Sequence, residues 1–149
     1  MFFLGLWGRI EAMESTVKTL RLVQITMLAS IVLYVLIGER LAPHRSPNAA
    51  LFYAMSLVSI TTIGIILVVR RTLVLQSEDT LRERPTDTLA LNRWRSGYIV
   101  TYALAESQAL LGLVLRFLGF SLSQVAPFYV AGFILLLFFG PRMPSRELS

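Results

Sequence analysis

The 149-residue sequence contains no cysteine, which excludes disulfides, thiolate metal sites, iron–sulfur clusters and cysteine nucleophiles. Its only histidine is His44, so two histidines of one chain cannot ligate a haem. The sequence also has no metal-ligand cluster, no glycine-rich phosphate loop and no serine–histidine–aspartate set. We therefore expect neither an enzyme nor a bound metal or cofactor.

Charged residues are also scarce. They make up only 15% of the chain, whereas apolar residues make up 55%, and the mean hydropathy is +0.66. In soluble globular proteins roughly a quarter of the residues are charged. The net charge of +5 does not indicate a nucleic-acid partner, because the arginines lie between the apolar blocks. The composition therefore predicts a multi-pass membrane protein with membrane lipids as its first partners.

The apolar residues form blocks that match a bilayer core of about 30 Å, which needs roughly 20 helical residues. Membrane-spanning helices are predicted at about residues 20–38, 49–69, 97–117 and 122–140. The link between the third and fourth blocks is so short that these two helices should form an antiparallel hairpin. We expect one all-α membrane domain over residues 1–149, built as a four-helix bundle.

The positively charged residues predict the orientation of this bundle. With four spans, both termini and the central loop, residues 70–96, lie on one side of the membrane. All lysines and arginines except Arg40, Arg45 and Arg116 fall on that side. The positive-inside rule therefore places both termini and the loop in the cytoplasm, most simply in a bacterial inner membrane. Residues 1–12 are either an interfacial segment or upstream sequence, if translation starts at Met13.

The central loop combines basic and acidic residues and is interrupted at Arg84–Pro85. This pattern predicts a solvated loop with a short helix on either side of Pro85. Basic and aromatic residues at the membrane boundary are typical of contacts with lipid headgroups. The residues expected to make such contacts are Arg70, Arg71, Arg93, Trp94 and Arg95.

Glu106 is the one acidic residue inside a predicted span. It lies about nine residues, or roughly 13 Å, from the start of the third span. Such a residue costs on the order of 3 kcal/mol to insert, and it usually faces the interior of a bundle. By depth and helical spacing, Ser59 and Thr62 of the second span and Tyr102 should share a site with it. Either Glu106 fixes helix register through hydrogen bonds, or it binds and releases H⁺ or Na⁺.

Residues 84–116 contain Arg84–Pro85, then Arg93, then the sequence YALAESQALLGLVL over residues 102–115. This stretch resembles the polar loop and outer helix of the c subunit, the proteolipid of rotary ATP synthases. In that family a cytoplasmic arginine–proline loop leads into a helix of the form ALAEAxAIYGLVVAL, whose glutamate carries the ion. The resemblance implies an ion-binding role for Glu106 and cytoplasmic contacts for the Arg84 region.

Two functions follow from these patterns. The first is a non-enzymatic accessory or structural subunit, which packs against other membrane subunits or forms a homo-oligomer and uses Glu106 to set register. The alternative is an H⁺- or Na⁺-translocating subunit of proteolipid type, with Glu106 as the ion site and Ser59 or Thr62 as supporting ligands. The single glycine of the second span, Gly64, favours the first function. The carboxylate within an ALAE helix favours the second.

Overall fold

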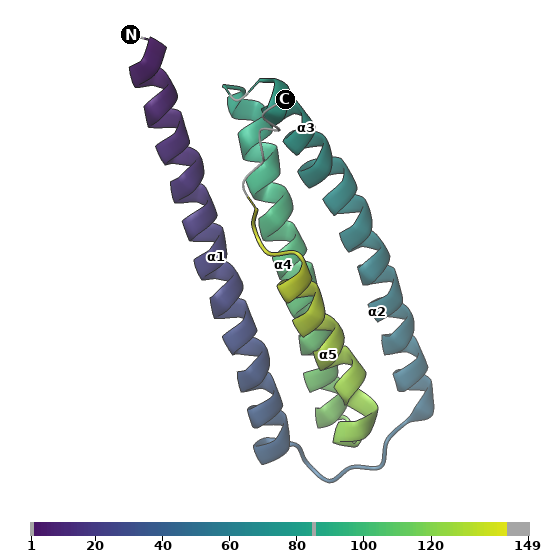
Figure 1. Ribbon diagram of the computed structural model, residues 1–149. Coiled ribbons are helices and arrows are strands. Elements are labelled where there is room, and N and C mark those ends of the chain that lie inside the picture. The colour runs from purple at the N-terminus through teal and green to yellow at the C-terminus, as the bar shows by residue number, and fades with distance from the viewer. Residues whose placement is uncertain (1, 85, 143–149) are drawn as a thin grey trace.

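The computed structural model describes residues 2–84 and 86–142 (Figure 1). These residues form helices and connections, with no strand among them, as an all-α fold predicts. The elements are α1 (Phe2–Leu41), α2 (Ala49–Val69), the π-helical η1 (Arg70–Leu75), α3 (Gln76–Glu83), α4 (Thr88–Phe117) and α5 (Leu122–Phe138).

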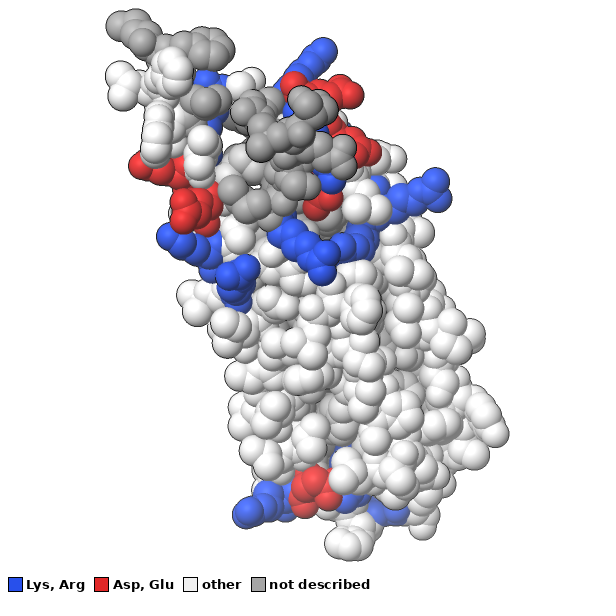
Figure 2. Space-filling model, in the orientation of Figure 1, with Lys and Arg blue, Asp and Glu red and all other residues white. Residues whose placement is uncertain are grey.

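Three of the helices are long and apolar enough to cross a membrane. They cover Phe3–Leu41, Ala49–Glu83 and Thr88–Phe117, whereas α5 is an apolar helix of only 17 residues. Figure 2 shows a broad uncharged band on the visible face, with charged side chains gathered at its two ends. The chain therefore has the helices of a membrane protein, as its composition predicts.

The helices extend well beyond the apolar blocks. α2 continues through η1 and α3 as one helical stretch of 35 residues that ends at Glu83. α4 already begins at Thr88, where the Asp87 side chain caps it by accepting bonds from the backbone N–H groups of Leu89 and Ala90. The two helices expected on either side of Pro85 are thus extensions of the long helices, because no helix breaker separates residues 70–83 from α2.

α4 lies at the centre of the bundle, with α1 and α2 on its flanks and α5 running antiparallel along it (Figure 1). The hairpin expected from the short link between α4 and α5 is present. Small residues allow these two helices to approach closely, as is common in membrane bundles. A Cβ atom on Gly132 of α5 would lie 2.8 Å from the carbonyl oxygen of Ala105. The central position of α4 means that its polar residues face three different neighbours.

Candidate functional site

Glu106 lies on α4 and is half-buried against α1. Its Oε1 atom accepts a hydrogen bond of 2.6 Å from the hydroxyl of Tyr34. Tyr34 is not among the partners predicted for Glu106. Counting residues places its Cα nearer to the C-terminal end of α1 than the level of the carboxylate. A helical tyrosine reaches back toward the N-terminus of its helix, which brings the hydroxyl about one turn closer to Glu106. This bond joins α1 to α4 inside the apolar band.

Gln108 makes a second polar link, on another side of α4. The hydroxyl of Ser59, on α2, donates to Gln108 Oε1 in a short hydrogen bond, and Gln108 Nε2 donates to the Ser59 carbonyl at 3.2 Å. Both residues are buried. Residues two apart on a helix point about 200° apart, so Glu106 faces α1 while Gln108 faces α2. Gln108 is a polar residue within a span, but its lack of charge kept it out of the prediction.

The structure therefore does not bring the predicted site residues together. Ser59 pairs with Gln108, and the Thr62 hydroxyl donates to the carbonyl of Val58 in its own helix at 2.8 Å. Tyr102 is fully buried, and its hydroxyl has no hydrogen-bond partner among the described residues. The expectation that Ser59 and Thr62 face Glu106 is wrong, because Ser59 contacts the side of α4 that carries Gln108 and the Thr62 hydroxyl bonds within α2.

The surroundings of Glu106 can hold a proton more readily than a metal ion. A hard cation needs several converging oxygen ligands, whereas Tyr34 is the one described side chain that hydrogen-bonds to Glu106. Across residues 2–84 and 86–142, no group of three or more histidines, cysteines, aspartates or glutamates could hold a metal ion. The geometry is that of a hydrogen bond between two helices, with a carboxyl group that remains partly exposed.

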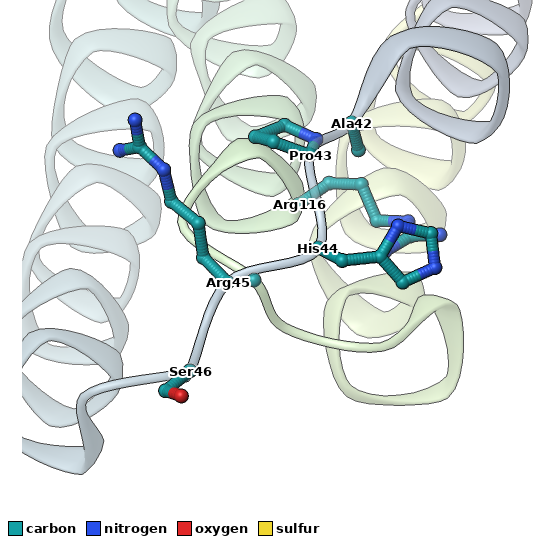
Figure 3. Close-up of a pocket in the computed structure, with 7 residues that line it drawn as sticks. Ala42, Pro43, His44, Arg45, Ser46 and Arg116 are labelled. Carbon is teal, nitrogen blue, oxygen red and sulfur yellow. The ribbon is translucent and has the colours of Figure 1, made fainter.

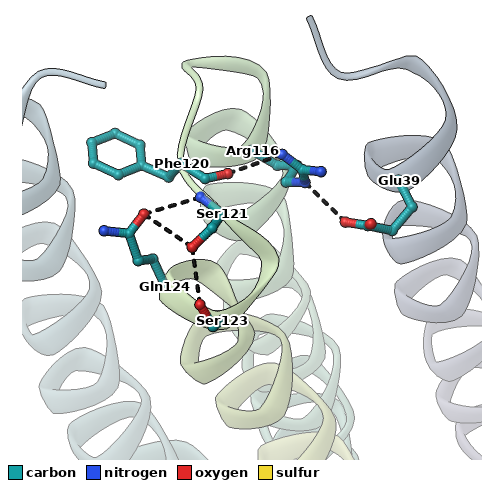
Figure 4. A network of polar contacts seen from close by, with 6 residues as sticks. All are labelled: Glu39, Arg116, Phe120, Ser121, Ser123 and Gln124. Carbon is teal, nitrogen blue, oxygen red and sulfur yellow. Dashed lines mark hydrogen bonds and ion pairs between the residues drawn. The ribbon is translucent and has the colours of Figure 1, made fainter. Parts of the chain in front are cut away.

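A third polar link lies at the end of the bundle where α1 stops and α4 turns into α5. Arg116 Nε donates to Glu39 Oε1 on α1 at 2.8 Å, and its Nη1 donates to the Phe120 carbonyl at 3.1 Å (Figure 4). Ser121 and Gln124 form a capping box at the start of α5. Both side chains of the ion pair are partly exposed. Arg116 thus connects α1 to the α4–α5 turn.

A cavity of about 330 Å³ opens beside this ion pair (Figure 3). It is lined by residues 42–46 of the α1–α2 connection and by Arg116 and Gly119. His44 and Arg116 extend to one side of the connection, and Arg45 extends to the other (Figure 3). Gly119 has φ +101° and lies against the backbone of Arg45, where any other residue would be strained and would clash. The cavity therefore lies where the α1–α2 connection meets the α4–α5 connection.

The residues expected at lipid headgroups divide into two groups. Arg71, Arg93 and Arg95 are exposed, as such contacts require. Arg70 is half-buried, and its guanidinium carbon lies 4.1 Å from the centroid of the Phe139 ring. Arg70 is thus held inside the bundle end by a cation–π contact, which distinguishes it from its neighbour Arg71.

The placement of Trp94 corrects the prediction. Its side chain is fully buried, and its Nε1 donates to Glu78 Oε1 on α3 at 3.3 Å. Its ring also makes an edge contact with Tyr98, at 5.1 Å between centroids. Trp94 faces α3 instead of lipid headgroups because the helical extension after α2 packs against the start of α4.

No protein-family model, curated protein or solved structure matches this chain. The resemblance of residues 84–116 to the c subunit therefore stays a prediction. In this structure the helix that carries the ALAE sequence is α4, which contacts α1, α2 and α5 within one chain.

Proposed function

We propose that this protein is a small, non-enzymatic membrane subunit with four spans and both termini in the cytoplasm. It packs against other membrane helices or against copies of itself. Glu106 serves to fix the register of α4 against α1. The observation that carries this proposal is the 2.6 Å hydrogen bond between Tyr34 and Glu106, which gives the intramembrane carboxyl a partner within its own chain.

Polar residues elsewhere in the band support the same role. The Ser59–Gln108 pair joins α2 to α4, and Gln24 Nε2 on α1 donates to the Leu136 carbonyl of α5 at 2.6 Å. With Tyr34 and Glu106, these contacts connect three pairs of helices. Hydrogen bonds between membrane helices are worth about 1 kcal/mol each and fix how helices pair. Their distribution is that of a bundle held in one register.

Four spans are supported by the position of α5. Although 17 residues rise only about 25 Å, α5 starts beside Arg116 and ends beside Arg70. These two arginines lie at opposite ends of the apolar helices, so α5 reaches across the same band as its neighbours. Snorkelling side chains and local thinning of the bilayer accommodate a helix of this length.

Association with other helices is supported by the surface of α2. In the most apolar stretch of Ala49–Glu83 only 11% of the residues are buried within the chain. Large apolar side chains such as Leu57 and Ile60 are two-thirds exposed. In a membrane this surface contacts either lipid tails or neighbouring helices. Close van der Waals packing is what drives association with neighbouring helices.

The proposal is tested by the mass of the protein extracted from its membrane in a mild detergent. Light scattering corrected for bound detergent is expected to give a protein mass well above the 16.7 kDa of one chain. A sample that stays monomeric at every detergent concentration would contradict the association with copies or partners. Mass spectrometry of the same particle then separates a homo-oligomer from a complex with other subunits.

A second function, proton transfer by Glu106, is favoured by one observation. The Glu106 side chain is only partly buried, so its carboxyl is open at the side of the bundle to a neighbouring subunit, which would have to supply the path for the proton. The discriminating experiment is proton flux into liposomes under a membrane potential, with Glu106→Gln as the control. The subunit role predicts equal, background flux for both proteins, whereas a carrier requires flux that disappears in Glu106→Gln.

A further inference from the structure

The cavity between the α1–α2 and α4–α5 connections is lined by side chains that can bind a ligand. Arg116, His44 and Ser46 line it, and its volume is about 330 Å³. Pockets for small ligands in proteins typically measure about 300–1,000 Å³. Figure 3 shows His44 and Arg116 extending to the same side of the α1–α2 connection. The cavity therefore has room for a small charged group in contact with these two side chains.

Arg116 has hydrogen-bond donors to spare at this cavity. Its Nε atom donates to Glu39, and its Nη1 atom donates to the Phe120 carbonyl. A guanidinium has five N–H groups, and the other three make no hydrogen bond to the described residues. The Arg116 side chain is 22% exposed, so a ligand in the cavity can reach these groups. The two existing bonds hold the guanidinium in one orientation.

The α1–α2 connection adds two more donors. The His44 and Ser46 side chains are exposed, and neither makes a hydrogen bond to the described residues. An imidazole N–H and a serine hydroxyl can both donate to an anionic oxygen. Gly119, with φ +101°, allows the α4–α5 turn to lie against the backbone of Arg45. The contact between the two connections therefore keeps these donors close to Arg116.

The charges at this end of the bundle favour an anion. Residues 38–48 and 116–123 contain three arginines, Arg40, Arg45 and Arg116, and one acid, Glu39. Positive charge is therefore in excess, even with Glu39 paired to Arg116. A phosphate oxygen is a strong acceptor for arginine donors. The apolar run of α4 also ends at Arg116, which is the level of the lipid phosphates in the proposed four-span arrangement.

We propose that this cavity binds a phosphate group, with Arg116 as the charged donor and His44 and Ser46 as supporting donors. The phosphate is carried either by an anionic phospholipid or by a soluble anion, and the same donors serve both. Glu39 competes with the phosphate, because both accept from the Arg116 guanidinium. The site does not depend on whether Glu106 fixes register or carries protons.

Glu39→Gln is the first test, because the proposed site predicts a gain of affinity. The protein in a nonionic detergent is titrated separately with phosphatidylglycerol and with inorganic phosphate. Binding is followed by native mass spectrometry and by the thermal midpoint. The substitution removes a negative charge and weakens the acceptor that competes for Arg116. Binding should become about threefold to fivefold tighter, as expected for a partly exposed charge, and unchanged or weaker binding would contradict the site.

Arg116→Gln is expected to weaken binding about tenfold or more, because charge-assisted hydrogen bonds are lost. Arg40→Gln is the matched control. Arg40 is exposed and carries the same charge, but it does not line the cavity. Its loss should change binding by less than about threefold, since an exposed charge outside the cavity acts only through general attraction.

His44→Ala keeps the test decisive if Arg116→Gln does not fold, because His44 makes no hydrogen bond within the bundle. It should weaken binding about fivefold, since one hydrogen bond is lost. Binding of phosphatidylglycerol that follows these variants and resists millimolar inorganic phosphate would assign the phosphate to a lipid. Stabilisation by inorganic phosphate that follows them would assign it to a soluble anion. Equal losses for Arg116→Gln and Arg40→Gln with both titrants would reduce the effect to general attraction and overturn the site.

Discussion

Replacing Gly132 by alanine tests how closely α4 and α5 pack. The new Cβ atom would lie 2.8 Å from the Ala105 carbonyl oxygen and 3.3 Å from the Ala109 backbone nitrogen. Both neighbours are backbone atoms, so the helices must separate, and overpacking of this kind typically costs about 1–3 kcal/mol. Alanine also gains about 1 kcal/mol over glycine within a helix. The net effect of Gly132→Ala is therefore a loss of up to about 2 kcal/mol.

Gly64→Ala is the matched control, because a Cβ atom on Gly64 of α2 meets nothing within 4 Å. Both substitutions bring the same gain in helix propensity, which cancels when the two variants are compared. Gly132→Ala should therefore be less stable than Gly64→Ala by about 1–3 kcal/mol. Unfolding in mixed micelles of increasing dodecyl sulfate content, followed by the fluorescence of the buried Trp94, measures this difference. Equal stability of the two variants would refute the close packing of α4 on α5.

Three other predictions concern the polar links. In a double-mutant cycle of unfolding, Tyr34→Phe and Glu106→Gln should show a coupling of about 1 kcal/mol; a coupling near zero would contradict the bond between α1 and α4. Gln108→Leu should cost about 1–3 kcal/mol by leaving the Ser59 hydroxyl unpaired, and adding Ser59→Ala should restore part of this loss; no recovery in the double variant would count against the pair. Arg116→Gln should cost less than about 1 kcal/mol, because its ion pair is partly exposed, and the cost should shrink at high salt; an effect independent of salt would mean that packing dominates.

The sequence was sufficient to predict the helical class, the apolar segments and the α4–α5 hairpin. Runs of apolar residues end at Arg70–Arg71 and Arg116, as expected of a helix that leaves a bilayer, because a charged side chain is costly inside it. The same rule singled out Glu106 as the one acidic residue inside a predicted span. These features depend on the order of residues along the chain, which is what a sequence contains directly.

The partners of Glu106 could not be predicted in this way. Counting residues gives the depth of a side chain in the membrane, but it does not give the direction in which each helix faces. Ser59 and Glu106 lie at similar depth, yet Ser59 contacts the side of α4 that carries Gln108, whereas Glu106 is on the side that faces α1. Tyr34 was missed because its side chain runs along the helix, so that its hydroxyl lies at a different depth from its Cα. Neighbour relations between helices decide such contacts, and they follow from packing of the whole bundle.

Trp94 was misplaced for a related reason. An aromatic residue between arginines is typical of a membrane interface. Its burial depends on the continuation of α2 through η1 into α3, which brings Glu78 to the indole N–H. Arg70–Arg71 marks the end of the apolar segment but not the end of the helix, because arginine is a good helix former. Charge predicts where a helix leaves the membrane, whereas breakers such as Pro85 predict where it stops.

The central claim is that the Glu106 carboxyl is held by Tyr34 as a fixed contact between helices. It is tested most directly by the rate at which a hydrophobic carbodiimide, which attacks protonated carboxyls reachable from lipid, labels Glu106 in lipid-reconstituted protein. We expect slow labelling at every pH and Na⁺ concentration, and faster labelling in Tyr34→Phe and after denaturation. Rapid labelling that titrates with pH, or that Na⁺ slows, would contradict the claim and would identify Glu106 as an exchangeable ion site.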